Sequence, residues 1–219
     1  MTRERMIGEF ESAIHSLAFS PDGNFFAIGT GDGNIYLVNL QNAANIALLK
    51  GHNNSVHSLS FSPDSQTLIS AGGFDRRIGI WDLAKSSFNS NSINADWLED
   101  HRDSVLVVAV SPDGTRLASA GYERTIIIWD LKAKRIHSTL SGHLSAVRCL
   151  EFDTNGEKLL SAGDDECLKI WNLASQECVL NVPLKLSGIH KISRHHGKKR
   201  IAISGKKNQI AILESASFF

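Results

Sequence analysis

The sequence predicts an all-β protein built from about five copies of one unit of four antiparallel strands. Three observations predict this class: an internal repeat with a period near 42 residues, short apolar segments that alternate with period two, and turns rich in Pro, Asp and Gly. The 219 residues are 42% hydrophobic and 21% charged, which is the composition of a globular chain rather than of a disordered one.

Each repeat opens with an alternating strand that leads into a tight turn. Four copies of this opening occupy residues 13–23, 55–65, 104–114 and 146–156, and three of them contain Ser-Pro-Asp. Proline presets φ at the second turn position and glycine accepts positive φ, so the motif favours a turn between two strands. The segment 56–61, Val-His-Ser-Leu-Ser-Phe, alternates as a strand with one buried face does.

A second apolar strand ends each repeat, and one position in it marks the period. The markers are Val38, Trp81, Trp129, Trp171 and Leu213, at successive spacings of 43, 48, 42 and 42 residues. The longer spacing coincides with an Asn- and Ser-rich stretch at 86–94, which we interpret as an extended loop before a strand around Trp97. The expected repeats are 10–50, 51–98, 99–141, 142–184 and 185–214.

These residues resemble the WD-repeat (tryptophan–aspartate repeat) family of β-propellers. The resemblance rests on the Gly-His pairs at 51–52 and 142–143, the Ser-Pro-Asp turns, and the Trp-Asp or Trp-Asn pairs at 81–82, 129–130 and 171–172. It implies a single domain over residues 1–219, a β-propeller of about five four-stranded antiparallel blades. We expect residues 5–8 to supply the outer strand of the last blade and to close the ring, and the alternative is an open ring completed by another chain.

Repeats two to four each combine His, Ser, an acid and Trp, which raises the hypothesis of a catalytic triad. The resemblance implies instead a buried structural chain, in which the Trp ring N–H donates to Ser, Ser to His, and His to the acid. Repeat three has a glutamate where the family has aspartate, so we expect its chain to be strained or rebuilt. The structural residues are His52, Ser70, Asp75, Trp81, His101, Ser119, Glu123, Trp129, His143, Ser161, Asp165 and Trp171.

The two end repeats lack this set and should depend on apolar packing. Phe10 and Val38 replace His and Trp in repeat one, and Lys207 and Leu213 occupy the acid and Trp positions of repeat five. The remaining His and Cys residues do not have metal-ligand spacing, and no glycine-rich phosphate loop opens a helix. We therefore expect no catalytic residue, no metal site and no cofactor, and we predict that the protein is not an enzyme.

The resemblance implies that partners bind the face that carries the turns between the second and third strands of each blade. Phe74 and Tyr122 fall at equivalent turn positions of adjacent blades, and aromatic residues are enriched in binding hot spots. Scattered exposed aromatics are the alternative interpretation. The partner-binding candidates are His15, His57, Phe74, Leu106, Tyr122, Arg148, Asp164 and Lys206.

The neutral total of 23 basic and 23 acidic residues conceals a basic final repeat. Residues 183–213 hold eight Lys and Arg and no acid, whereas residues 1–182 hold 15 basic and 22 acidic side chains. Such a surface attracts phosphate, nucleic acid or an acidic protein, and a solvated face is the competing and preferred interpretation. The basic patch comprises Lys191, Arg194, Lys198, Lys199, Arg200 and Lys207.

The function predicted from these features is a non-enzymatic scaffold that presents a propeller face to partner proteins or peptides. The alternatives are a nucleic-acid or phosphate-associated module that uses the basic fifth blade, and a partial propeller completed by another chain. We expect one or more protein partners, a monomer rather than a homodimer, and no membrane association. The three cysteines form no disulfide framework and the N-terminal residues contain no signal core, so we predict an intracellular protein, cytoplasmic first and nuclear as a second option.

Overall fold

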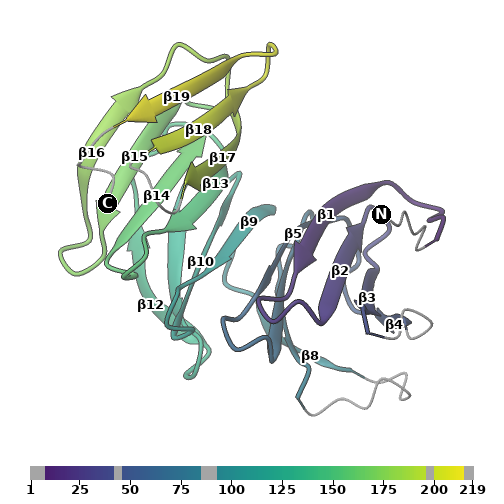
Figure 1. The fold of residues 1–219 in the computed structure, drawn as a ribbon. Helices are drawn as coiled ribbons and strands as arrows, with labels where there is room; N and C mark the ends of the chain where they lie inside the picture. The colour runs from purple at the N-terminus through teal and green to yellow at the C-terminus, as the bar shows by residue number, and fades with distance from the viewer. Residues whose placement is uncertain (1–7, 42–45, 85–92, 196–199, 215–219) are drawn as a thin grey trace.

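The computed structural model describes residues 8–41, 46–84, 93–195 and 200–214 (Figure 1). Within these ranges the chain forms the strands β1 to β19 and no helix. Every pair of neighbouring strands in a sheet is antiparallel, and every sheet contains strands that are consecutive in the sequence. The predicted all-β class is therefore confirmed.

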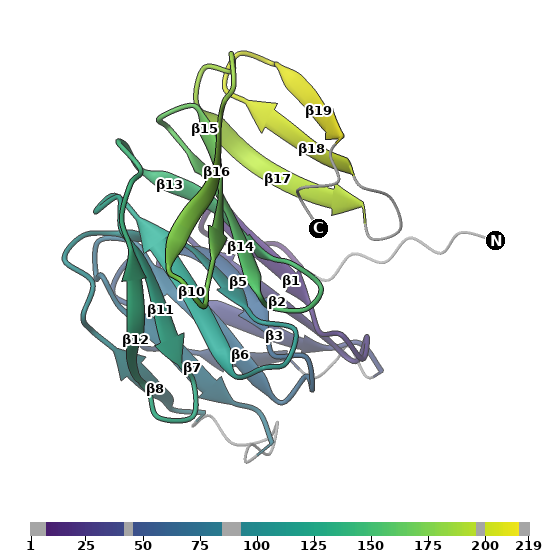
Figure 2. The same cartoon turned by 90° about the vertical axis from the view of Figure 1, so that its left-hand side faces the viewer.

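Five sheets, which we call blades one to five, follow one another along the chain (Figures 1 and 2). Their strands are β1 Ile14–Phe19, β2 Phe25–Thr30, β3 Ile35–Asn39 and β4 Ile46–Leu49; β5 Val56–Phe61, β6 Thr67–Gly72, β7 Ile78–Asp82 and β8 Ala95–Leu98; β9 Val105–Val110, β10 Arg116–Gly121, β11 Ile126–Asp130 and β12 Arg135–Leu140; β13 Val147–Phe152, β14 Lys158–Gly163, β15 Cys167–Asn172 and β16 Glu177–Pro183; β17 Ile189–His195, β18 Arg200–Gly205 and β19 Ile210–Glu214.

The predicted Pro-Asp-Gly turns join the first and second strands of the blades. Gly23, Gly114 and Gly156 have φ values of 72°, 72° and 70°, and Ser65 adopts the same conformation at 61° in blade two. The preceding residues reinforce the turn, because the Ser62 hydroxyl donates to the Asp64 carboxylate at 2.5 Å.

The hydrophobic core is divided among the four interfaces between consecutive blades. Each interface packs the second, third and fourth strands of one blade against the first strand of the next, together with its tryptophan where the next blade is two, three or four. Trp81, Trp129 and Trp171 are almost completely buried in these clusters. The first strands contact each other in the order β1, β5, β9, β13, β17, so they lie innermost and surround a central channel. This is the arrangement of a five-bladed β-propeller.

The blades do not all contain the same number of described strands. Blades one to four have four strands, whereas the described part of blade five has three, in the order β17-β18-β19. Of the segment predicted to supply its outer strand, residues 5–7 lie outside the described residues, and Gly8 belongs to no strand. Blades one and five form the two ends of the arc of sheets (Figure 1).

Candidate interaction surface

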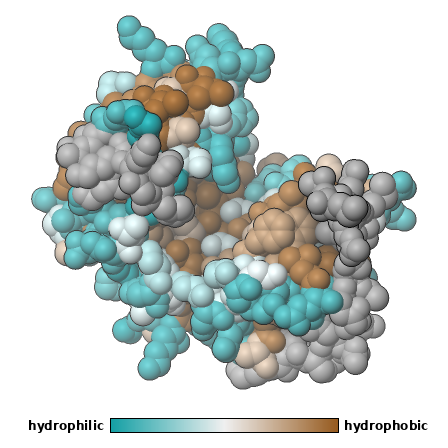
Figure 3. All heavy atoms as spheres, in the orientation of Figure 1, coloured by the Kyte–Doolittle hydropathy of each residue, from teal (hydrophilic) through white to brown (hydrophobic). Residues whose placement is uncertain are grey.

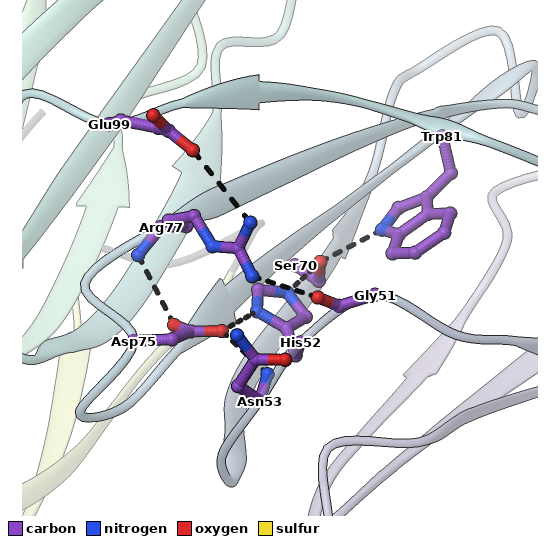
Figure 4. A network of polar contacts seen from close by, with 8 residues as sticks. All are labelled: Gly51, His52, Asn53, Ser70, Asp75, Arg77, Trp81 and Glu99. Carbon is purple, nitrogen blue, oxygen red and sulfur yellow. Dashed lines mark hydrogen bonds and ion pairs between the residues drawn. The ribbon is translucent and has the colours of Figure 1, made fainter.

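The polar chain predicted for blade two is present and joins four strand and loop segments (Figure 4). The Trp81 ring N–H donates to Ser70 Oγ at 2.8 Å, Ser70 Oγ lies 2.7 Å from His52 Nε2, and His52 Nδ1 lies 2.7 Å from Asp75 Oδ2. Each donor has one acceptor when His52 carries its proton on Nδ1. Asp75 also accepts the backbone N–H of Asn53.

Blade four contains the same chain with nearly the same distances. Trp171 Nε1 donates to Ser161 Oγ at 2.7 Å, Ser161 Oγ lies 2.6 Å from His143 Nε2, and His143 Nδ1 lies 2.8 Å from Asp165 Oδ2. Burial lowers the pKa of His143, although the facing carboxylate of Asp165 raises it. The neutral imidazole is the form that accepts from Ser161 and donates to Asp165.

Glu123 completes the chain of blade three despite its extra methylene. Its Oε1 lies 2.5 Å from His101 Nδ1, and its Oε2 accepts the backbone N–H of Arg102 at 3.1 Å. These are the contacts that the aspartates make in blades two and four. Burial raises the pKa of Glu123, but the hydrogen bond and charge of His101, together with the backbone N–H and charge of Arg102, leave the pKa below its ordinary value.

The three serines of these chains are inaccessible to a substrate. Ser70, Ser119 and Ser161 have no exposed surface, and each hydroxyl already accepts a tryptophan N–H. A nucleophile must reach its substrate, so this geometry supports the structural interpretation of the Ser-His-acid sets over the catalytic one.

At one end of the channel, backbone hydrogen bonds define five equivalent turn positions. The N–H groups of Gly31, Gly73, Tyr122, Asp164 and Lys206 donate to the carbonyls of Ala13, Ser55, Ser104, Ala146 and Ser187 respectively. The second residues of the first strands lie beside these turns, namely His15, His57, Leu106, Arg148 and His190. We call this set of ten residues the channel mouth.

The structure corrects the equivalence predicted for Phe74. Gly73, not Phe74, occupies the position of Tyr122, because the turn between β6 and β7 is one residue longer than the turn between β10 and β11. Phe74 therefore projects from an inserted residue and is 75% exposed. Tyr122 is also exposed, so both aromatics remain on the surface, but not at matching positions.

His15 and His57 meet at the channel mouth. Their ring centroids lie 5.3 Å apart in an edge-to-face arrangement. An added Cβ at Gly31 would lie 3.1 Å from His15 Nε2, and one at Gly73 would lie 2.9 Å from His57 Nε2. Glycine at these two turn positions thus leaves room for the imidazoles. Both histidines line a pocket of about 370 Å³ with Lys191 of blade five.

Blades three, four and five are linked at the channel mouth by a charged cluster. Arg148 makes a bidentate contact with Asp164 at 2.8 to 3.0 Å, and its guanidinium lies 5.6 Å from the ring centre of Tyr122. Lys206 Nζ contacts the same carboxylate at 2.8 Å. Burial raises the pKa of Asp164, but the hydrogen bonds and positive charges of Arg148 and Lys206 together lower the pKa below its usual value.

Sequence reasoning missed one exposed residue near this face. Leu144 directly follows His143 and is 79% exposed, and its backbone N–H donates to Asp165. The corresponding residues after His52 and His101 are Asn53 and Arg102, so an apolar residue after the Gly-His pair was the available signal. Leu106, predicted as a partner contact, is only partly exposed.

The described members of the predicted basic patch do not form a single free cationic surface. Arg194 is paired with Glu151 and Arg200 with Glu214. Lys191 faces the channel pocket, and Lys207 lies in the exposed turn after β18. Lys198 and Lys199 lie outside the described residues. Within the described ranges, no group of three or more His, Cys, Asp or Glu side chains is placed to hold a metal ion.

Comparison with known proteins identifies the repeat. The sequence matches the family described as "WD domain, G-beta repeat" at residues 4–39, 44–82, 94–130 and 134–172. The chain belongs to the WD40 repeat family. Its propellers generally act as protein-interaction scaffolds. Among the described residues there is no apolar helix of the length needed to cross a membrane.

Several relatives are individually named. The chain is 29% identical over 144 residues to an uncharacterized WD repeat-containing protein of Synechocystis sp., covering 65% of this chain and 39% of the relative. It is 27% identical to the anaphase-promoting complex subunit cdc20 of Dictyostelium discoideum, covering 63% of this chain and 26% of the relative. It is 31% identical to the WD repeat-containing protein VIP3 of Arabidopsis thaliana, covering 64% of this chain and 46% of the relative. The chain thus spans less than half the length of each.

A solved structure shares the fold. A chain in the crystal structure of a mitotic checkpoint complex superposes with a TM-score of 0.84 at 22% identity, over 96% of this chain and 64% of that chain.

Proposed function

We propose that this WD40 protein is a non-enzymatic scaffold that binds partner proteins or peptides through the channel mouth and through its rim, by which we mean the exposed residues Phe74 and Leu144. The observation that carries the proposal is the exposure of Phe74, Tyr122 and Leu144 on the loops at this end of the channel, with Tyr122 against Arg148 of the Arg148–Asp164 cluster. Exposed apolar anchors next to charged groups are the composition of a binding hot spot. The inaccessibility of the three serines supports the absence of triad chemistry.

The comparisons support a role in protein complexes without naming the partner. One relative is named as a subunit of the anaphase-promoting complex, and the solved neighbour belongs to a mitotic checkpoint complex. Both names describe assemblies of proteins, which agrees with protein binding as the general use of this fold.

Substitution of the two exposed aromatics tests this proposal. Phe74→Ala with Tyr122→Ala should abolish capture of the partner while leaving the melting temperature nearly unchanged, because Phe74 is 75% and Tyr122 44% exposed. Val179→Ala is the matched control, since Val179 is an exposed apolar residue on the outer strand β16. Capture that survives the double substitution would remove the proposed site.

The two ends of the arc of sheets favour a second candidate function, which is the binding of blade-like β-sheets of another chain. Val56, Val105, Val147 and Ile189 begin the first strands of blades two to five and are fully buried by the preceding blade. In blade one the same face is exposed, and Phe19 is 67% in solvent. A hollow lies between the two ends, with apolar side chains on its walls (Figure 3).

The described part of blade five likewise exposes apolar side chains on β19, its last strand. Ile210 and Ile212 of β19 are largely exposed, whereas their counterparts Leu168 and Ile170 of β15 are fully buried by blade five. Blade-like β-sheets of another chain would cover both ends as neighbouring blades cover the internal faces. This partner would fill the hollow rather than contact the channel mouth.

Different substitutions separate the two candidates. Leu17→Ser with Phe19→Ser should abolish capture of a blade-like partner and leave capture at the channel mouth intact. Light scattering of the isolated chain provides the second measurement. A mass near 24.0 kDa is expected for the monomer, and a stable dimer would indicate that a second copy covers these faces.

A further inference from the structure

The starts of four of the five first strands carry cationic or protonatable residues, and none of the five carries an acid at its second or third position. The second and third positions of these strands hold His15 and Ser16, His57 and Ser58, Leu106 and Val107, Arg148 and Cys149, and His190 and Lys191. Five of these ten residues are His, Lys or Arg. This local excess contrasts with the equal numbers of acids and bases in the whole chain.

The acid beside these strand starts, Asp164, is already engaged by two cations. Asp164 contacts both Arg148 and Lys206, so these three side chains together carry one net positive charge. Lys191 forms no ion pair with any residue in the described ranges and faces the pocket beside His15 and His57. The pocket therefore holds a cation without a carboxylate partner from the residues that line it.

The surroundings of His57 indicate that a ligand in the pocket should be negatively charged. Its imidazole is half-buried, against His15 from β1, and near Arg148 from β13 and Lys191 from β17. Burial lowers the pKa of His57, and the positive charges of His15 and Arg148 lower it further. An anion placed in the pocket would reverse this unfavourable environment for the protonated ring.

We propose that the pocket of about 370 Å³ at the channel mouth binds the carboxylate side chain of an acidic peptide segment, with Lys191 as the fixed cation and His15 and His57 as proton-dependent donors. This inference rests on the scaffold function proposed above and names the chemistry of the partner segment. A peptide also fits the rim, because its apolar residues can contact Phe74 and Leu144.

A polypeptide fits this site better than a nucleic acid does. The described residues that line the pocket include one Lys and no Arg, whereas a phosphate backbone requires a row of free cations. Arg194 and Arg200, which would extend such a row along blade five, are paired with Glu151 and Glu214. Among the described residues, Lys191 is the one Lys or Arg that lines the pocket.

Binding of a carboxylate should be linked to protonation. The charged and titratable groups around His57 are His15, Arg148 and Lys191, with Asp164 and Lys206 behind Arg148. A bound carboxylate favours the protonated imidazole, so the complex takes up a proton and affinity rises as pH falls. Uptake of up to one proton predicts an increase of about three- to tenfold between pH 7.5 and pH 5.8.

Fluorescence anisotropy with labelled hexaglutamate tests the proposal at low ionic strength. Hexaglutamine, which has the same length and no charge, is the control probe, and inorganic phosphate is the competitor. The variants are Lys191→Gln and His57→Gln, with His137→Gln as the matched control because His137 is exposed on the outer strand β12. Melting temperatures of all variants verify that each one is folded.

The proposal predicts that hexaglutamate binds, that hexaglutamine does not, and that affinity rises toward pH 5.8. Lys191→Gln should weaken binding about tenfold at both pH values, and His57→Gln should remove most of the pH dependence, while His137→Gln changes neither. Binding of phosphate without binding of hexaglutamate would overturn the carboxylate assignment. Absence of hexaglutamate binding would also overturn it, whereas partner capture that still requires Phe74 and Tyr122 would leave the scaffold function standing.

Discussion

His143→Ala is the substitution that most directly tests the buried polar chain of blade four. The His143 side chain has no exposed surface and joins Ser161 at 2.6 Å to Asp165 at 2.8 Å. Its removal leaves the Ser161 hydroxyl with the Trp171 N–H as its remaining partner in the chain. Asp165 retains the backbone N–H groups of Leu144 and Cys167.

The expected loss of stability follows from the two hydrogen bonds. The bond to the neutral serine contributes about 1 kcal/mol, and the bond to the charged carboxylate contributes about 1.5–3 kcal/mol. The sum of about 3 kcal/mol lowers the melting temperature by about 6–12 °C for a chain of this size. His137→Ala is the control, since it removes an exposed histidine from β12 and should change the melting temperature by about 1 °C or less.

Calorimetry or circular dichroism at pH 7.5 measures both variants. A melting temperature for His143→Ala within about 2 °C of the parent chain would refute the energetic role of the chain. A double-mutant cycle with Asp165→Ala adds a second readout, because two residues in direct contact should show a coupling energy of about 1 kcal/mol or more.

Three further predictions concern pH and backbone packing. Burial lowers the pKa of His143 in the folded chain, whereas the unfolded chain takes up a proton near pH 6.5, so the stabilisation by His143 is complete above pH 6.5 and declines as pH falls below that value. Urea midpoints at pH 7.5 and 5.5 should therefore differ less in His143→Gln than in the parent chain. An equal difference in the two proteins would contradict this. Chiefly through the hydrogen bond from the Ser111 hydroxyl, the pKa of Asp113 is lowered to about 2, so the stabilisation by the Asp113 carboxylate is present above pH 3.8 and disappears as pH falls through 2. Asp113→Asn should therefore flatten the acid unfolding curve between pH 4 and 2. An unchanged curve would count against this prediction. Gly163→Ala should lower the free energy of unfolding by about 2 kcal/mol, because the new Cβ would lie 2.1 Å from the Ala146 carbonyl oxygen. Gly8→Ala is the control, since its Cβ meets open space and should leave the denaturation midpoint unchanged. Equal midpoints for the two variants would show that the backbone at Gly163 accommodates the methyl group.

The repeat made the fold and the buried chain predictable from the sequence. Regular spacing of Trp81, Trp129 and Trp171 determines which strands pair, and the same spacing brings each Ser to its His and acid. Glu123 shows the limit of this reasoning, because the sequence did not reveal that the longer side chain would retain both the imidazole and the backbone contact.

The interaction surface was less predictable, since it depends on turn length and on contacts between blades. One extra residue in the turn after β6 moves Phe74 out of the position of Tyr122, and the sequence conceals this shift because both aromatics directly precede the turn acid. The sharing of Asp164 by Arg148 and Lys206 joins residues of two blades, which no single repeat encodes. Closure of the ring remains a prediction, because residues 5–7 lie outside the described part of the chain.

The most direct test of the scaffold function is capture of partners by the tagged 219-residue chain from native lysate, analysed by mass spectrometry with and without nuclease. The account predicts a protein partner that is retained after nuclease treatment and lost when Phe74 and Tyr122 are replaced by alanine. Capture that disappears on nuclease treatment would contradict it and would assign binding to the basic residues of blade five.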